Sequence, residues 1–407
     1  MARAMPYGWG RVPYDWENRR PWLDLPFPVE EYEARIGKIR RLMAEKHLDT
    51  LIVHGHSGDF ANIRYLSNYE IFGAGEAVVV LPAAGRPALV TNAVMHGEPM
   101  HSGIHQTWME DARAAPATRS VVGISKFDTV ADHVEDMLRE RGLTRARLGY
   151  VGEYARPLEE TIAARFAETS AARADDILTQ ARAIKSDAEV EVLRRCTNIA
   201  DVALKACMDA VREGVTEHDL CAEAYYSLMK EGADGPAFSI AMVAGPRCGF
   251  KHVGPTNRKL QRGDIVYVDI GARYRGYCSD TSRHRTVGDP TPEQRRFMET
   301  QIQILDACIA GMRPGVRSGD LAPMAQEMAR GAGYENEFYY RGHGIGCGIF
   351  ELPSIHPKDQ MPLEPNMVFV HEPMLVRAGF GTACVEDMYR VTPSGCERLS
   401  TCPVRWW

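Results

Sequence analysis

The sequence lacks the features that mark membrane proteins. Its apolar runs, such as Ala77–Ala84, fall well short of the roughly 20 residues that a membrane-spanning helix needs. The first residues include Arg and several aromatic side chains and contain no apolar signal core. We therefore expect a cytoplasmic protein with no membrane partner.

An excess of positive charge is also missing. The 54 Asp and Glu residues outnumber the 48 Lys and Arg residues, and the formal net charge is -6. Because affinity for nucleic acid depends on clustered Lys and Arg, and no such cluster stands out, we expect no nucleic-acid partner.

Paired cysteine motifs are absent as well. The ten cysteines all lie from Cys196 onward, and no two form a Cys-x-x-Cys pair. In an intracellular protein of this size they are expected to be reduced and mostly buried, which argues against cysteine-based zinc or iron-sulfur sites. No heptad or short-period repeat indicates a solenoid or scaffold.

The length of 407 residues exceeds what one hydrophobic core usually spans, so two domains are expected. In the first half, helical spacing of Ile36, Ile39 and Met43 predicts a helix from Pro28, and further helices and strands alternate after it. This alternation predicts an α/β domain. The predicted strands are 50–53, 77–81, 88–91 and 148–151, with a helix over 130–141.

The pattern changes near 171–177, and a long amphipathic helix is predicted over 187–211. Turn-rich segments then separate predicted strands, which together indicate a helix-covered, mainly antiparallel sheet of α+β type. The predicted strands are 265–270, 276–285, 367–370 and 384–391. We accordingly predict an irregular N-terminal arm over 1–26, rich in Pro, Trp, Arg and Tyr, a first domain over 27–177 and a second domain over 178–407.

Four carboxylates lie on or beside apolar strand candidates, where burial is costly unless a cation or hydrogen-bond donors compensate. They are Asp269, Asp280, Glu372 and Glu386. His343 lies between glycines that let its imidazole approach other groups closely. Any one acid alone reads most simply as a salt-bridge partner, but together the five side chains suit two divalent ions such as Mn, Co, Fe or Zn.

These residues lie in segments that resemble the pita-bread metallohydrolases, the family of prolidase, aminopeptidase P, methionine aminopeptidase and creatinase. The resemblance covers nearly the whole chain apart from the arm. The matching segments are Val268–Asp280, Gly342–Gly346, His371–Pro373 and Val385–Asp387, together with Arg182–Asp187 and Asn62–Leu66.

The resemblance implies a creatinase-like α/β N-terminal domain, a pita-bread catalytic domain and a homodimer. It also implies a metal-dependent hydrolase of a C–N bond, with Mn as the first choice of metal. In this family pattern Asp280, His343 and Glu372 hold one ion and Asp269 holds the other, while Asp280 and Glu386 bridge the two.

Two catalytic roles follow from the same resemblance. Glu372 is the expected proton shuttle for the attacking water. His252, which lies seventeen residues before Asp269, matches the histidine that donates to the substrate carbonyl or its developing oxyanion. A structural role for His252, as a loop histidine bonded to backbone, remains open.

The sequence departs from the prolidase pattern at two positions of the expected substrate pocket. Phe350 replaces a second histidine, and Cys384 replaces an arginine two residues before Glu386. Loss of a proton donor and of a fixed cation should weaken recognition of a peptide carbonyl or a proline carboxylate.

The substrate is therefore expected to be a short peptide or a small molecule. An Xaa-Pro peptide is the default. A small non-peptide amide or amidine, as in creatinase or ectoine hydrolase, and C–S lysis, as in the dimethylsulfoniopropionate lyase of this fold, remain alternatives. A binding protein without activity is disfavoured because the whole ligand set is present.

Strand alternation adds one hypothesis that does not depend on the family. Side chains two residues apart face the same side of a strand. Cys278 should thus accompany Asp280, and Cys384 should accompany Glu386, toward the metal side.

Overall fold

The structure is a computed structural model that describes residues 16–71, 75–94, 106–116, 129–250 and 252–406. The chain divides into two compact units, residues 1–181 and 182–407. Most of the predicted arm lies outside the described residues. Its last part is less irregular than predicted, since it contains a short helix, α1 (Trp16–Arg19), and a 3₁₀ turn, η1 (Arg20–Trp22).

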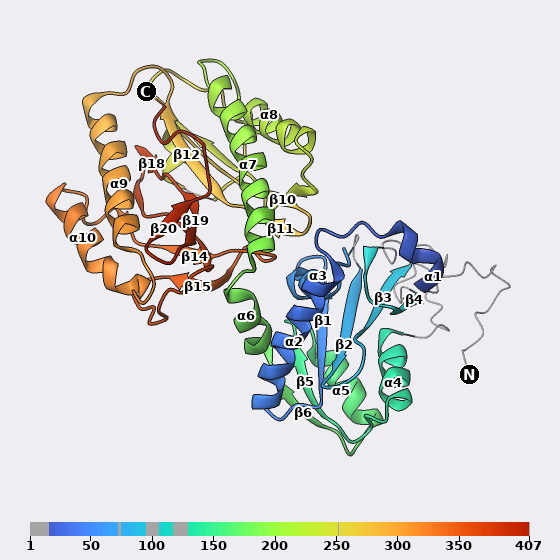
Figure 1. The fold of residues 1–407 in the computed structure, drawn as a ribbon. Coiled ribbons are helices and arrows are strands. Elements are labelled where there is room, and N and C mark those ends of the chain that lie inside the picture. The colour runs from blue at the N-terminus through green and yellow to red at the C-terminus, as the bar shows by residue number, and fades with distance from the viewer. Residues whose placement is uncertain (1–15, 72–74, 95–105, 117–128, 251, 407) are drawn as a thin grey trace. The chain divides into compact units, whose positions relative to one another are not determined.

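The first unit contains a six-stranded mixed sheet in the order β4-β3-β2-β1-β5-β6 (Figure 1). The β1–β2 and β2–β3 pairs are antiparallel, and the β3–β4, β1–β5 and β5–β6 pairs are parallel. The predicted strands of this half are all present. The bounds are β1 (Thr50–His56), β2 (Glu76–Pro82), β3 (Ala88–Val94), β4 (Asp111–Pro116), β5 (Arg147–Val151) and β6 (Ser170–Arg173).

Helices cover this sheet because each buries an apolar stripe. On α4 (Val130–Glu140) the residues Val134, Met137 and Leu138 are spaced three and four apart and join one core with Val78 and Val80 of β2. A capping box between Thr129 and Asp132 begins this helix. The other helices are α2 (Val29–Glu45), α3 (Ala61–Ser67), α5 (Arg156–Arg165) and α6 (Asp175–Ala183).

The second unit contains four sheets whose strand pairs are antiparallel throughout the described residues. The largest has the order β15-β14-β16-β19-β20, and another has the order β12-β9-β8. The strands are β7 (Gly235–Pro236), β8 (Ala241–Ala244), β9 (Ile265–Ile270), β10 (Ala272–Tyr274), β11 (Tyr277–Cys278), β12 (Thr281–Thr286), β13 (Phe338–Tyr339), β14 (Gly342–Gly344), β15 (Glu351–Ile355), β16 (Val368–His371), β17 (Met374–Arg377), β18 (Gly381–Ala383), β19 (Asp387–Val391) and β20 (Cys396–Arg398).

Two pairs of helices back these sheets, and Figure 1 shows α7 and α9 on opposite sides of the strands. One core lies between α7, α8 and β9, and a second lies between α9, α10 and β16. The helices are α7 (Asp187–Ala210), α8 (Glu217–Lys230), α9 (Pro292–Gly311) and α10 (Ala322–Gly331), with 3₁₀ turns η3 (Gly245–Gly249) and η4 (Ser318–Leu321).

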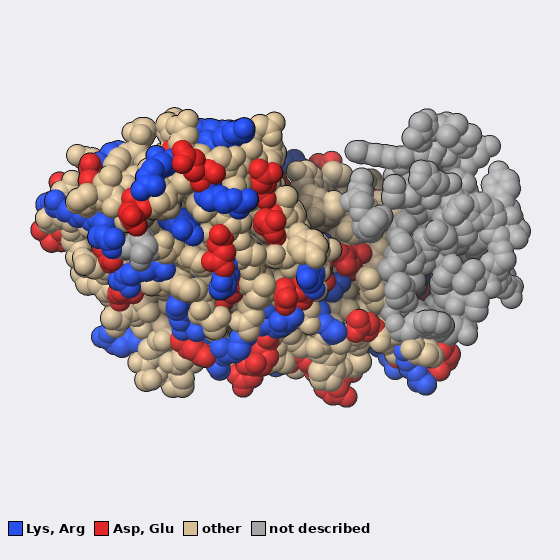
Figure 2. Space-filling view, turned by 90° about the horizontal axis from the view of Figure 1, so that it is seen from above, with Lys and Arg blue, Asp and Glu red and all other residues tan. Residues whose placement is uncertain are grey.

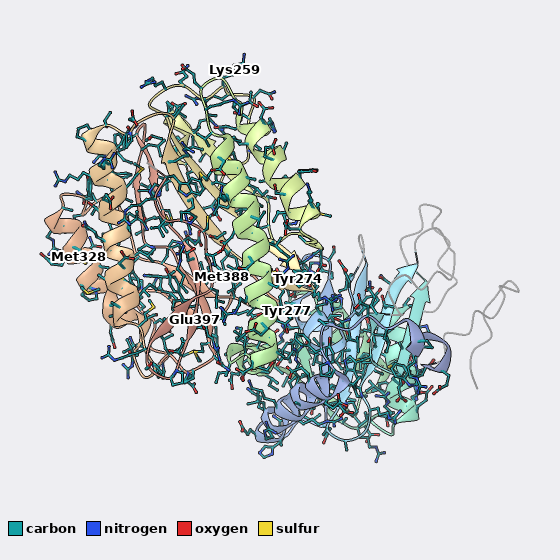
Figure 3. The ribbon with its side chains drawn as sticks, turned by 45° about the horizontal axis from the view of Figure 1, so that its top comes forward. Lys259, Tyr274, Tyr277, Met328, Met388 and Glu397 are labelled. Carbon is teal, nitrogen blue, oxygen red and sulfur yellow. The ribbon has the colours of Figure 1, made fainter. Side chains whose placement is uncertain are left out.

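Helix α7 also forms side-chain hydrogen bonds to two strands that are far apart in the sequence. The Tyr277 hydroxyl donates to Glu189 Oε1 at 2.8 Å, and the Thr197 hydroxyl donates to Met388 Sδ at 3.2 Å. Tyr277 and Met388 are labelled beside this helix in Figure 3. The helix therefore aligns β11 with β19, the two strands next to the predicted ligands Asp280 and Glu386.

Two predicted strands are wrong in one respect, because each is interrupted where it carries a predicted ligand. The stretch 276–285 breaks at Ser279–Asp280, and 384–391 is not a strand before Asp387. The backbone N–H groups at the two breaks find other acceptors. Ser279 N donates to Ala272 O at 2.9 Å, and Val385 N donates to Gln301 Oε1 at 2.9 Å. Such irregularities reorient side chains and are common beside active sites.

The surface gives no sign of a polyanion-binding face where it is visible. Figure 2 shows Lys and Arg interspersed with Asp and Glu on the face drawn there. Across the described residues, no helix combines the length and the apolar composition needed to cross a bilayer.

A buried ion pair stabilises the second unit. Arg283 and Asp387 are both fully buried, with Nη2 2.8 Å from Oδ1. The same guanidinium donates to Glu386 O at 2.9 Å and to Pro403 O at 2.6 Å. Arg283 thus links β12 and β19 to the C-terminal segment.

We expect Arg283→Met to lower the free energy of unfolding of the second unit by about 3–5 kcal/mol, because Asp387 keeps only Arg398, on Oδ2, and the carbonyls of Glu386 and Pro403 lose the guanidinium as a donor. The exposed Arg156, paired with Glu160, is the control, and Arg156→Met should cost under about 0.5 kcal/mol. Denaturant titration followed by circular dichroism measures both changes. Equal stability of the two variants would contradict the role given to Arg283.

Candidate metal centre

Asp269 reaches the site through the alternation of β9. Val266 and Val268 pack into the core beneath α7 and α8, whereas Tyr267 packs with Cys384 on the other side. Asp269 shares the side of Tyr267, whose hydroxyl donates to Oδ2 at 3.0 Å. Burial and then the Asp269 carboxylate raise the pKa of Tyr267 well above its usual value, so the phenol remains a donor.

Asp280 and Glu386 are brought together by backbone pairing across the two strand breaks. Ser282 N donates to Glu386 O, and Glu386 N donates to Ser282 O, each at 3.2 Å. Both carboxylates are buried.

His343 lies in the middle strand of a tightly packed part of the five-stranded sheet. A Cβ added at Gly342 would lie 2.3 Å from Val370 O, and one at Gly344 would lie 2.3 Å from Leu352 O, so only glycine fits on either side. Nδ1 donates to Gly344 O at 3.0 Å. This contact leaves Nε2, which lies 3.4 Å from Asp280 Oδ2, as the nitrogen that can bind a metal.

Glu372 lies at the junction of β16 and β17. Its backbone N donates to Arg341 O at 3.1 Å, and Arg341 Nε donates to Glu372 Oε1 at 3.1 Å. The carboxylate is therefore fixed from the neighbouring strand.

These side chains form two overlapping groups of potential metal ligands, Asp280–His343–Glu386 and Glu372–Cys384–Glu386. Within each group the donor atoms all lie within 4.8 Å of one another, and every member is buried. Carboxylates this close and this poorly solvated repel one another unless a cation lies between them. The donor set of carboxylate oxygens and one imidazole fits borderline divalent ions, and the thiol adds a softer donor.

Asp269, the fifth predicted ligand, falls in neither group. It lies beside them through strand pairing, because Asp269 is opposite Ser282 in the β9–β12 pair and Ser282 is in turn paired with Glu386. His252 Nδ1 lies 3.9 Å from Asp269 Oδ2.

The loop that carries His252 is held by a buried carboxylate that the sequence did not reveal. Glu217 Oε1 accepts from Ala244 N at 2.9 Å, and Oε2 accepts from Thr256 N at 2.8 Å and from Arg247. Glu217 thereby fixes both ends of the loop. His252 itself has φ of 65° and a side chain that is 53% exposed, which leaves it accessible to a ligand.

Gln301 of α9 is a second positioning residue that the sequence did not indicate. It is buried, accepts from Val385 N at 2.9 Å, and donates to Pro373 O at 2.6 Å. These are the neighbours of Glu386 and Glu372. A polar residue on the buried face of a predicted helix is the one signal that could have found it.

Phe350, one of the two predicted pocket departures, lies at the mouth of the site. Its ring is 4.6 Å from the His343 ring, and the residue is 72% exposed. The next residue, Glu351, is fully buried and bonded to Lys185 at 3.0 Å. Burial alone would raise the pKa of Glu351, but Lys185 and Arg182 outweigh it and lower the pKa, which keeps the carboxylate ionised.

The two predicted thiols differ. Cys384 lies with Glu386 in one of the ligand groups, on the side where it was expected, although the chain from Cys384 to Glu386 is not a strand. The Cys278 thiol instead donates to Cys347 O at 3.6 Å. The alternation fails for Cys278 because the strand breaks between it and Asp280.

An open depression of about 780 Å³ lies next to the centre. Its wall includes Arg341 and Gly342 but none of the five predicted ligands.

Comparison with known proteins identifies the family. The family model described as Metallopeptidase family M24 matches residues 191–393, and the one described as Creatinase/Prolidase N-terminal domain matches residues 35–184. A putative dipeptidase of Bacillus subtilis, YkvY, is 31% identical over 295 residues, which are 72% of this chain and 81% of that protein. The chain belongs to metallopeptidase family M24.

Two further similarities support the assignment of this M24 member. The Xaa-Pro dipeptidase of Pyrococcus furiosus is 29% identical over 281 residues, 69% of this chain and 78% of that one. The crystal structure of prolidase from Pyrococcus horikoshii OT3 has a TM-score of 0.78 at 22% identity and covers 91% of this chain and 99% of that one. The predicted fold, an α/β domain followed by a pita-bread domain, is confirmed, and the chain is a metallohydrolase.

The M24 centre is framed by two buried neutral histidines. His284 Nδ1 accepts from Cys384 N at 3.0 Å, and His371 Nδ1 donates to Arg341 O at 3.1 Å. Burial lowers the pKa of each to about 4. The backbone around the ligands is thus held without added charge.

We expect His284→Asn to make stability less sensitive to acid. Because the folded pKa of His284 is about 4 against an ordinary 6.5, the unfolded state binds more protons between these values, and wild-type stability falls as pH drops from 6.5 to 4. Asn keeps an acceptor for Cys384 N. It should remove the contribution of His284 to the pH dependence of the free energy of unfolding, which is up to about 1.4 kcal/mol per pH unit. Denaturation midpoints over this range test this, with the exposed His218→Asn as control. An unchanged slope for His284→Asn would refute the assignment.

Proposed function

We propose that this M24 peptidase binds two divalent ions, with Mn first among Mn, Co, Zn and Fe, and hydrolyses the bond before proline in Xaa-Pro peptides. The observation that carries the proposal is the convergence of buried ligand atoms from Asp280, His343, Glu372 and Glu386 in two overlapping groups, with Asp269 on the adjoining strand β9. A shared carboxylate can bridge two adjacent ions. Relatives named Xaa-Pro dipeptidase indicate the substrate.

The ligand assignment follows the family pattern. Asp280, His343, Glu372 and Glu386 would hold one ion, and Asp269, with Asp280 and Glu386, would hold the other. Divalent ions at this place would supply Lewis acidity and a water of lowered pKa.

Two side chains of the protein then carry the proton chemistry. Glu372 accepts a proton from the attacking water and passes it to the leaving nitrogen, and Arg341 orients its carboxylate at 3.1 Å. His252 donates to the carbonyl oxygen as negative charge develops there. The Glu217 clamp keeps the His252 loop in place.

A small non-peptide amide is the second candidate substrate. The exposed Phe350 ring covers His343 where prolidases carry another histidine, so this wall of the pocket is apolar. An apolar wall suits a small solute that needs no proton donor on that side.

We further propose a cytoplasmic homodimer. The ten cysteines are all free, as expected in a reducing compartment. The dimer follows from the resemblance to prolidases, which commonly form one.

Replacement of metal ligands and of His252 should have different effects. Asp280→Ala or Glu386→Ala should abolish binding of both ions, because each carboxylate bridges, whereas His252→Ala should keep both ions and lose turnover by about 100- to 1000-fold. Mass spectrometry of bound metal, with a kinetic assay, measures this. Asp209→Ala, exposed on α7, is the matched control. Full activity of His252→Ala would remove it from the mechanism.

The substrate is tested on the Mn-loaded protein with Xaa-Pro dipeptides, longer Xaa-Pro peptides and small amides. We expect two ions per chain and cleavage of Xaa-Pro substrates. Cleavage of small amides alone would favour the second candidate, and a product without solvent oxygen would indicate a lyase. Failure to bind any divalent ion would overturn the proposal.

A further inference from the structure

Arg341 lies against the ligand groups and is anchored at three points. Its carbonyl accepts from Glu372 N at 3.1 Å and from His371 Nδ1 at 3.1 Å. Its Nε donates to Glu372 Oε1 at 3.1 Å. The guanidinium is therefore held in place from both backbone and side chain, at the strand junction next to a predicted ligand.

The outer part of this guanidinium is open. The Arg341 side chain is 42% exposed, whereas that of Glu372 is 3% exposed. Within the described residues, the hydrogen bond recorded for the guanidinium uses Nε, which leaves the two terminal nitrogens for another acceptor. Two parallel N–H groups of arginine match a carboxylate in geometry and charge.

Cys384 occupies the position where prolidases often carry an arginine. Its thiol lies within 4.8 Å of the Glu372 and Glu386 donor atoms and is fully buried. The cation missing from position 384 is thus replaced by one that pairs with Glu372 from position 341, directly before β14.

We infer that Arg341 is a specificity residue that binds the free carboxylate of the substrate, which makes the enzyme a dipeptidase. The inference rests on the proposed function. A guanidinium this close to the metal ligands reaches a carboxylate on the residue that follows the scissile bond. In a longer peptide that carboxylate is replaced by a neutral amide, which cannot form the ion pair.

The test compares glycyl-proline with glycyl-prolinamide, which lacks only the negative charge. The Mn-loaded wild type should prefer the dipeptide. Arg341→Met should lower kcat on both substrates, because Glu372 loses the donor that orients it, and should lose a further factor of about 10 to 100 in kcat/KM on the dipeptide alone, through KM. Arg377→Met is the matched control, since Arg377 is part-buried and paired with Glu337 and Glu293 away from the ligands.

Two readouts do not depend on turnover. Calorimetric binding of proline should weaken in Arg341→Met, whereas binding of prolinamide should not. Metal content should remain at the wild-type level, because the variant removes a positive charge next to the carboxylates. If Arg341→Met loses metal, Arg341→Gln, which retains a donor for Glu372, replaces it in both assays.

A cation swap provides the strongest check. Arg341→Met combined with Cys384→Arg should recover most of the dipeptide preference, because a guanidinium returns to the same carboxylates from the neighbouring position. An unchanged ratio of dipeptide to amide activity in metal-loaded Arg341→Met would overturn the inference alone. A metal-loaded wild type that cleaves no Xaa-Pro substrate would overturn the proposed function and the inference with it.

Discussion

Repulsion among buried carboxylates is the constraint on which the second unit depends. Asp280 and Glu372 each place a carboxylate oxygen within 4.8 Å of one from Glu386, although each carboxylate would be better solvated apart from the others. The framework therefore has to hold them rigidly until cations compensate. Arg283 holds the backbone of Glu386, and Gln301 holds the residues next to Glu372 and Glu386. Holding these carboxylates together lowers the stability of the unit, and under the proposed function metal ions would offset that cost.

The histidines that support the backbone around the carboxylates are uncharged, so they do not change the net charge of the site. His284 and His371 are buried in their neutral form and bond the backbone beside Cys384 and Arg341. Protonated histidines there would compete with metal ions for the same carboxylates. Burial prevents this competition at neutral pH, whereas Arg341 supplies a cation that pairs with Glu372 at 3.1 Å.

The sequence predicted those parts that follow from local pattern. The strand containing Asp269 is a continuous apolar run, and the glycines around His343 signal close backbone approach, so both were found where the structure has them. The breaks at Asp280 and Glu386 were missed, because they depend on partners such as Ala272 and Gln301 that lie far away in the sequence. The roles of Glu217 and Arg341 depend on tertiary contacts in the same way, and residue type alone does not distinguish them from ordinary surface charges.

The two departures from the prolidase pattern therefore have unequal consequences. Judged from the sequence, Phe350 and Cys384 together remove a proton donor and a cation, which weakens the case for a peptide substrate. In the structure the cation is present from another position, since the Arg341 guanidinium lies on Glu372. Only the proton donor is lost, at the exposed Phe350 ring beside His343. Under the proposed function, a fixed cation at Arg341 and an apolar ring at Phe350 match a proline residue with a free carboxylate better than a neutral solute, and this favours the dipeptide over the small amide.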